Sequence, residues 1–230
     1  MSTLHSSPIR PASTPFVGAA EAAFIADLDQ KALHRVVDES VLPAELLGSG
    51  GESRQFVRFA AAMARFYFDT AEDLSKAKRL EVIRRVLEML RSHDDADDIL
   101  QLAGPLSTID WAIHAGYVTV DVRNAIVHAA ARAQRAANAL GLIVEHPDIL
   151  GGRPTFKGTR VPIDVAVGTA SSGPAFERMR ASYPFLTPAH IDAANVYSVI
   201  RPRRGRPLKL EHGPRPWKLK STRRIPRSGA

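Results

Sequence analysis

The sequence predicts a mainly α-helical protein with a few short strands, and three observations lead to this fold class. Apolar residues make up 45% of the 230 positions and recur at helical spacing in several segments, so packed helices can form a core. Glycine- and proline-rich stretches separate these segments, which is typical of several small units. The chain ends in a basic, proline-rich segment that cannot bury a core alone.

Composition also narrows the functional classes. The chain contains no cysteine, which excludes disulfides, thiolate zinc sites, iron–sulfur clusters and cysteine nucleophiles. No apolar run is long enough to span a membrane, and the polar start of the chain lacks the apolar centre of a secretion signal. We therefore expect a cytoplasmic protein without membrane contact.

Residues 1–15 are predicted to be a flexible N-terminus, and residues 16–50 predict a helix-turn-helix. Apolar positions between Ala19 and Leu28 indicate a first short helix, and Asp29 can cap a second one. The buried stripe of the second helix would be Leu33, Val36 and Val37. Its exposed positions, the candidate DNA contacts, are Gln30, Lys31, His34 and Arg35. The same pattern also fits an ordinary helical hairpin.

Residues 51–141 predict a central α-rich region with a possible role in dimerisation. The region follows a flexible break, GSGGES, and its first segment, RQFVRFAAAMARFYF, fits either a strand followed by a helix or one buried helix. Thr70 is the predicted N-cap of the next helix. A strand at about 117–122 leads into an alanine-rich helix at about 121–140, which ends at Gly141. Its small side chains would let another helix approach closely, so this helix is the candidate dimer surface.

No motif predicts a metal site, a cofactor site or catalysis. The acidic run HDDADD is a short polar stretch with no second ligand cluster at a suitable spacing, so we expect solvated carboxylates. None of the eight histidines lies in a metalloprotease spacing, and no nucleophile elbow occurs. We therefore expect a protein that is not an enzyme and binds no cofactor.

Residues 142–200 predict a small helix-turn-helix-like domain. The segment LIVEH indicates a strand, and three helices follow at about 163–169, 174–181 and 188–199, the last capped by Thr187. The loop HPDILGGRPTFKGTRVPID between them lacks the spacing of a phosphate-binding or dinucleotide-binding loop. Its glycines and prolines suit turns. Two of its three cations, Lys157 and Arg160, are candidates for contact with a phosphate backbone or a partner.

The tail, residues 201–230, carries most of the positive charge. It holds 11 of the 31 Lys and Arg residues and one acid, a net charge of +10, whereas the first 200 residues have a net charge of −3. A basic block of this kind is predicted to be disordered alone and to bind an anionic partner.

Two stretches of the C-terminal domain resemble a known family. The segment HPDILGGRPTFKGTRVPID, followed by YPFLTPAHIDAANVY, is similar to the bacterial domain-of-unknown-function family numbered 433. The residues that carry the match are Pro147, Gly152, Pro154, Gly158, Thr159, Arg160, Pro162, Tyr183, Pro184, Leu186 and Thr187. One departure lies at GTASSGPAFERM, where family members more often show an acidic helix start.

The resemblance implies a VapB-type antitoxin, the partner of a toxin with a PIN-like ribonuclease fold. Such a protein would neutralise its toxin by direct binding, and would bind operator DNA to repress its own operon, as a homodimer or a larger complex with the toxin. Guanidinium groups pair with the carboxylates of a ribonuclease active site, and an aromatic side chain can anchor the arm. The predicted toxin-binding residues are Arg201, Arg203, Arg204, Arg206, Trp217 and Lys218.

The tail has a second interpretation. RPRRGRP is similar to an AT-hook, whose arginines enter the narrow minor groove of A·T-rich DNA. The alternative function is therefore a stand-alone DNA-binding transcriptional regulator with an AT-hook-like tail. An unspecific nucleic-acid tail is the third possibility.

Overall fold

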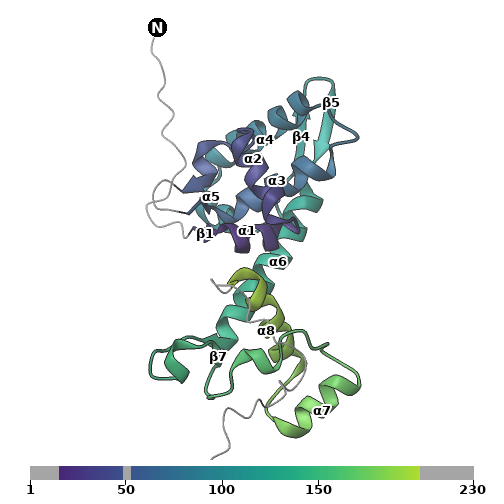
Figure 1. Cartoon of the computed structure of the whole chain (residues 1–230). Helices are drawn as coiled ribbons and strands as arrows, with labels where there is room; N and C mark the ends of the chain where they lie inside the picture. The colour runs from purple at the N-terminus through teal and green to yellow at the C-terminus, as the bar shows by residue number, and fades with distance from the viewer. Residues whose placement is uncertain (1–15, 49–52, 203–230) are drawn as a thin grey trace, which may run out of the picture.

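The computed structural model describes residues 16–48 and 53–202, and Figure 1 shows two lobes joined by one long helix, α6. The upper lobe contains the N-terminal and central segments, and the lower lobe contains the C-terminal domain. Helices dominate and the strands are short, so the predicted fold class is confirmed. No helix in the described ranges is long and apolar enough to cross a membrane.

The N-terminal unit has the element order of a winged helix-turn-helix, and we call it the winged helix. Its elements are β1 (Val17–Gly18), α1 (Ala19–Ala26), α2 (Gln30–Asp38), η1 (Ala44–Leu46), β2 (Leu47–Gly48), β3 (Gln55–Phe56) and α3 (Arg58–Asp69). The strands form an antiparallel sheet in the order β1-β3-β2, in which Phe56 pairs with both Val17 and Leu47. We call the β2–β3 hairpin the wing.

Two aspartates shape the turn between α1 and α2. Asp27 adopts a left-handed conformation, with φ of 56°, and ends α1. Asp29 caps α2 as predicted, because its Oδ1 accepts a hydrogen bond of 2.6 Å from the backbone N–H of Ala32. The two short helices predicted for this segment are therefore present and are joined by a tight turn.

The wing corrects the predicted division of the N-terminal half. The boundary between residues 50 and 51 falls inside the β2–β3 hairpin, and β3 supplies the central strand of the sheet. Gln55–Phe56 is a strand and α3 follows it, so the first of the two interpretations of this segment holds. α3 packs against α1, which makes residues 16–69 one unit apart from the undescribed positions 49–52.

The central segment completes the upper lobe. It contains α4 (Lys76–Arg91), α5 (Ala96–Leu100), β4 (Ala112–Ala115), β5 (Val118–Asp121) and α6 (Arg123–Leu142). Thr70 was the wrong cap: it ends α3, and Ser75 caps α4 by accepting a hydrogen bond from the Lys78 N–H at 3.3 Å. The predicted end at Gly141 was also wrong, because α6 runs through it to Leu142.

The lower lobe contains β6 (Ile143–Val144), η2 (Leu150–Gly152), β7 (Thr155–Phe156), η3 (Ile163–Val165), α7 (Pro174–Ser182) and α8 (Pro188–Ile200). β6 pairs with β7, so the glycine-rich loop contains a strand that the sequence did not indicate. The first of the three predicted helices is only a 3-10 turn. The other two form at their predicted places.

The alanine-rich face of α6 is used within the chain. Its buried residues include Ala125, Ala129, Ala133, Ala136 and Ala139. Helices α1, α3 and α8 pack against α6, so it forms the common support of both lobes. The alanine face predicted to form a dimer surface is therefore covered by helices of the same chain.

Enlarging one of these alanines should destabilise the fold. We expect Ala136→Leu to lower the free energy of unfolding by roughly 1–3 kcal/mol, because Ala136 is buried and the close helix packing has no space for a larger side chain. The neighbouring Ala137 is exposed, so Ala137→Leu is the matched control and should change stability little. Urea unfolding measures both, and equal effects would contradict the packing argument.

The start of α8 predicts a pH-dependent contribution to stability. Thr187 and His190 form a capping box, in which the Nδ1 of His190 accepts a hydrogen bond of 3.3 Å from the Thr187 N–H. Burial lowers the pKa of His190 below its ordinary value of 6.5, so the folded state binds this proton less readily than the unfolded state. The contribution is therefore present above pH 6.5 and is lost as the pH falls below it.

Thermal unfolding between pH 7.5 and 5 tests this contribution. His190→Gln keeps a capping side chain without a titratable ring. The melting temperature of the wild type should fall more steeply with decreasing pH than that of the variant. Parallel curves would show that His190 does not contribute.

Candidate nucleic-acid interface

The exposed face of α2 brings together the four residues predicted to contact DNA in the N-terminal unit. Gln30, Lys31 and Arg35 are exposed, and His34 is half-buried between them and the wing. Leu33 and Val36 point into the core on the opposite side, which fixes the orientation of the helix. The N-terminal turn of α2 is therefore available to a partner.

The base of the wing adds Arg54, which the sequence did not indicate. Its Nη1 lies 3.2 Å from Nδ1 of His34, and its Nη2 donates a hydrogen bond of 2.6 Å to Oδ1 of Asp38. Arg54 therefore ties the wing to α2. Arg54 is 16 to 20 residues from these partners in sequence. Helical periodicity relates residues only three or four positions apart, so the sequence pattern could not predict this contact.

The two acids at the end of α2 are neutralised by neighbouring cations. Glu39 pairs with Lys76 at 2.8 Å and with Arg35 at 3.1 Å. The hydrogen bond from Lys76 lowers the pKa of Glu39, and the same bond raises the pKa of Lys76. The guanidinium of Arg35 also lies over the ring of Phe68, 5.2 Å from its centroid.

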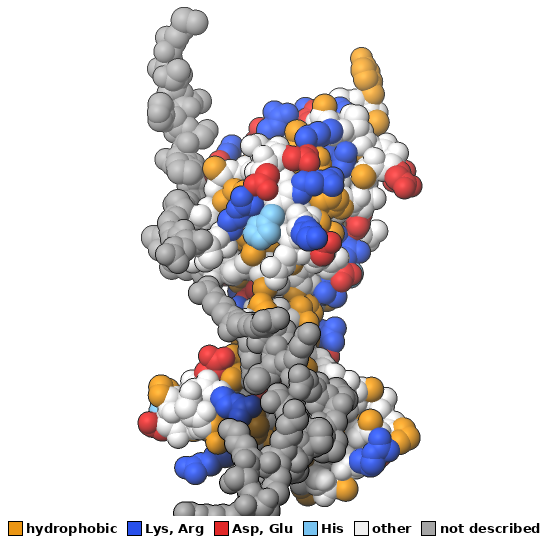
Figure 2. Space-filling view, viewed as in Figure 1, with side chains coloured by type: hydrophobic (Ala, Val, Ile, Leu, Met, Phe, Trp, Pro, Cys, Tyr) orange, Lys and Arg blue, Asp and Glu red, His pale blue; other side chains and the backbone are white. Residues whose placement is uncertain are grey.

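These pairs leave this face with a positive balance. The four cations Lys31, Arg35, Arg54 and Lys76 outnumber the three carboxylates of Asp29, Asp38 and Glu39. Within the described ranges, Lys31 forms no ion pair, so its ammonium is available to a phosphate. Figure 2 shows Lys and Arg side chains mixed with acidic ones over this lobe. The face suits an anionic polymer, with contacts at defined points and no continuous basic surface.

The other two predicted DNA contacts lie far from α2. Lys157 and Arg160 are exposed at the turn after β7, in the lower lobe, whereas α2 lies in the upper lobe. The turn is held by hydrogen bonds of Thr159 and Lys157 to backbone carbonyl groups, at 2.9 Å each. The structure therefore does not join these two residues to the α2 face.

The predicted toxin-binding residues lie almost entirely beyond the described chain. Arg203, Arg204, Arg206, Trp217 and Lys218 are outside the described residues. Arg201 is described, and its Nη1 forms an ion pair of 3.0 Å with Oε2 of Glu21 on α1. The first arginine of the tail is therefore in contact with the winged helix.

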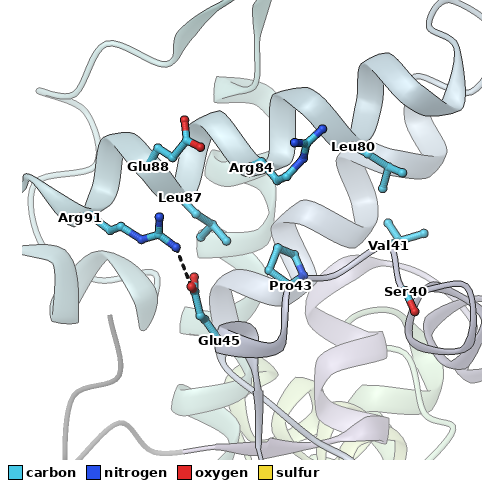
Figure 3. Close-up of a pocket in the computed structure, with 9 residues that line it drawn as sticks. All are labelled: Ser40, Val41, Pro43, Glu45, Leu80, Arg84, Leu87, Glu88 and Arg91. Atoms are coloured by element: carbon cyan, nitrogen blue, oxygen red, sulfur yellow. Dashed lines mark hydrogen bonds and ion pairs between the residues drawn. The ribbon is translucent and has the colours of Figure 1, made fainter. Parts of the chain in front are cut away.

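A groove of about 640 Å³ lies beside the winged helix, between α4 and the segment that follows α2 (Figure 3). Leu80 and Leu87 of α4 extend toward Val41 and Pro43 and form an apolar floor. The ion pair of Arg91 and Glu45, at 2.6 Å, closes one end. None of the predicted DNA-binding or toxin-binding residues lines this groove, so it is separate from the α2 face.

Over the described ranges, no group of three or more His, Asp or Glu side chains is arranged to hold a metal ion. The acidic run at residues 93–98 instead leads into α5, whose first turn contains Asp97 and Asp98. Acids at this end of a helix are favoured by the helix dipole, which is a structural role.

Comparisons with known proteins agree with the C-terminal prediction and extend it. Residues 143–198 match the family model "Protein of unknown function (DUF433)", which is the family predicted from the loop motif. The chain is also 30% identical over 220 residues to the uncharacterized protein y4eO of Sinorhizobium fredii, covering 94% of this chain and 96% of that protein. No solved structure matches the chain. Residues 143–198 therefore form a DUF433 domain, and the likeness to y4eO extends over nearly the whole chain, beyond this domain.

Proposed function

We propose that this protein is a DNA-binding transcriptional regulator that acts as the antitoxin of a type II toxin–antitoxin pair. The observation that carries the DNA-binding part is the winged helix-turn-helix, in which α2 presents Lys31 and Arg35 on an open face and Arg54 holds the wing against it. The antitoxin part rests on the DUF433 family and on the basic tail.

Binding through α2 follows from the geometry of helix-turn-helix proteins. The second helix enters the major groove, and its N-terminal residues contact base edges. Gln30 and Lys31 are the first residues of α2, and Arg35 lies one turn further along. We therefore assign base contacts to Gln30 and Lys31, and a phosphate or base contact to Arg35. A homodimer would place two copies of α2 on the half-sites of an operator.

Neutralisation of the toxin is assigned to the tail. A PIN-like ribonuclease holds a divalent metal with carboxylates, and arginines pair with such carboxylates through two parallel hydrogen bonds. The tail supplies 11 cations after residue 200 for such pairs, which need no metal. Both activities suit a cytoplasmic protein.

Two experiments test the proposal. Footprinting on the DNA upstream of the gene should show protection of a site in the size range of one or two half-sites, and α2 variants should lose it. Co-expression with the adjacent gene should rescue growth from its toxicity and yield a stable complex. A neighbour that is not toxic and does not co-purify would overturn the antitoxin assignment and leave the alternative, a stand-alone regulator with an AT-hook-like tail.

A further inference from the structure

A buried carboxylate links the winged helix to the end of the lower lobe. Glu21 lies on α1 and its side chain is only 2% exposed. Two arginines from distant parts of the chain contact it: Arg58 at the start of α3, at 3.6 Å, and Arg201 just after α8, at 3.0 Å. Three segments of the fold therefore meet at one buried charge.

Arg201 is the closer of the two cations. Both contacts are ion pairs, and the 3.0 Å separation from Arg201 is shorter than the 3.6 Å separation from Arg58. A buried carboxylate that loses its nearest cation is strongly destabilising to its surroundings. Glu21 lies on α1, and α1 packs directly against α2 and α3 in the winged helix, so the loss would affect these helices.

The end of α8 is held where Arg201 can reach Glu21. α8 packs against both α6 and α1. The hydroxyl of Tyr197 donates a hydrogen bond of 2.5 Å to Glu145, next to β6, and the Tyr197 carbonyl accepts one of 2.9 Å from the Arg201 N–H. The Arg201 side chain is 45% exposed, so it is accessible to a partner.

We propose that Arg201 is a positioning residue for DNA binding. Through Glu21 it holds α1, and with it α2, in the arrangement that fits the major groove. An acidic protein partner that binds Arg201 separates its guanidinium from Glu21 and thereby weakens DNA binding. This second step rests on the proposed function, whereas the role of the Arg201–Glu21 pair in the winged helix does not.

Charge-neutral variants of the pair test the positioning role. Arg201→Gln should lower affinity for the upstream DNA about tenfold, a typical coupling between sites, with an unchanged salt dependence because no phosphate contact is lost. Glu21→Gln should restore that affinity when added to Arg201→Gln, since the buried carboxylate that had lost its nearer cation is then replaced by a neutral amide. The melting temperature should follow the same order, with a loss for Arg201→Gln and recovery in the double variant.

Arg203→Gln is the matched control, because it removes the same charge from the same segment two residues away. Glu21→Gln should not rescue any affinity lost in Arg203→Gln. If Arg201→Gln reduces the salt dependence by about one phosphate contact and Glu21→Gln fails to rescue it, Arg201 contacts DNA directly and the proposal is wrong. An unchanged affinity and melting temperature for Arg201→Gln would also overturn it.

The partner step uses the purified product of the adjacent gene as the probe. Its addition should lower the DNA affinity of the wild type and lower that of Glu21→Gln much less. Equal losses in both proteins would contradict the coupling. If the wild type binds no DNA, the proposed function fails. The melting temperatures of the wild type, Arg201→Gln, Glu21→Gln and their double variant still decide whether Arg201 stabilises the winged helix through Glu21.

Discussion

Replacing Lys31 and Arg35 together with alanine should lower the affinity of the protein for its operator by about a hundredfold or more. Each lost base or phosphate contact costs roughly 1–3 kcal/mol, and both residues are on the exposed face of α2. The salt dependence of binding should also decrease, because fewer counterions are released. Fluorescence anisotropy with operator DNA at several salt concentrations measures both quantities.

A matched pair of cations in the lower lobe provides the control. Lys157→Ala with Arg160→Ala removes the same charge from an exposed turn that lies far from α2. This variant should keep most of the affinity if α2 alone reads the operator. Because Arg35 also pairs with Glu39 and contacts Phe68, the melting temperature of the α2 variant must be measured as well. If the α2 variant remains folded and binds like the wild type, α2 is not the recognition helix.

Truncation after Pro202 should abolish neutralisation of the toxin while the protein keeps at least part of its operator binding. The deletion removes the residues assigned to toxin contact beyond Arg201, together with most of the tail charge, but leaves the Arg201–Glu21 pair intact. Growth on co-expression with the adjacent gene, and recovery of the complex on an affinity column, measure the loss. Trp217→Ala should produce a smaller effect of the same kind, since it removes the aromatic anchor alone.

The same truncation separates the two proposed functions. An AT-hook-like tail predicts weaker binding to A·T-rich DNA and a smaller salt dependence, with no effect on a toxin. Full protection of growth by the truncated protein would show that the tail is not the inhibitor. Loss of both activities would indicate an arm that contacts DNA and toxin in turn.

Short-range chemistry was enough to predict much of the secondary structure. Asp29 and Thr187 stand directly before apolar-periodic segments, and each caps the helix that follows. The spacing of glycine, proline and threonine in residues 146–164 identified the DUF433 domain. Thr70 failed as a cap because Ser75 offers the same chemistry five residues later, and the apolar pattern could not choose between them.

The loop of residues 146–164 also shows where prediction from neighbouring residues stops. Gly151 and Gly158 have positive φ angles of 65° and 78°, as turn positions require, and their identity suggested turns. Thr155–Phe156 nevertheless forms a strand, because its partner Ile143–Val144 lies across the loop. A two-residue strand has no periodicity of its own, so only its pairing defines it.

The amino-acid sequence alone was sufficient to predict the helical class, the two short helices of residues 19–38, the exposed positions of the second one and the family of the C-terminal domain. These depend on neighbouring residues, whose spacing the sequence contains. Folding in three dimensions decided the wing, the contact of Arg54 with α2, the use of the α6 alanines inside the chain and the pairing of Arg201 with Glu21. Each of these contacts joins residues far apart in sequence. Apolar surface is buried, and the Glu21 carboxylate is paired, by segments that come together only in the folded protein.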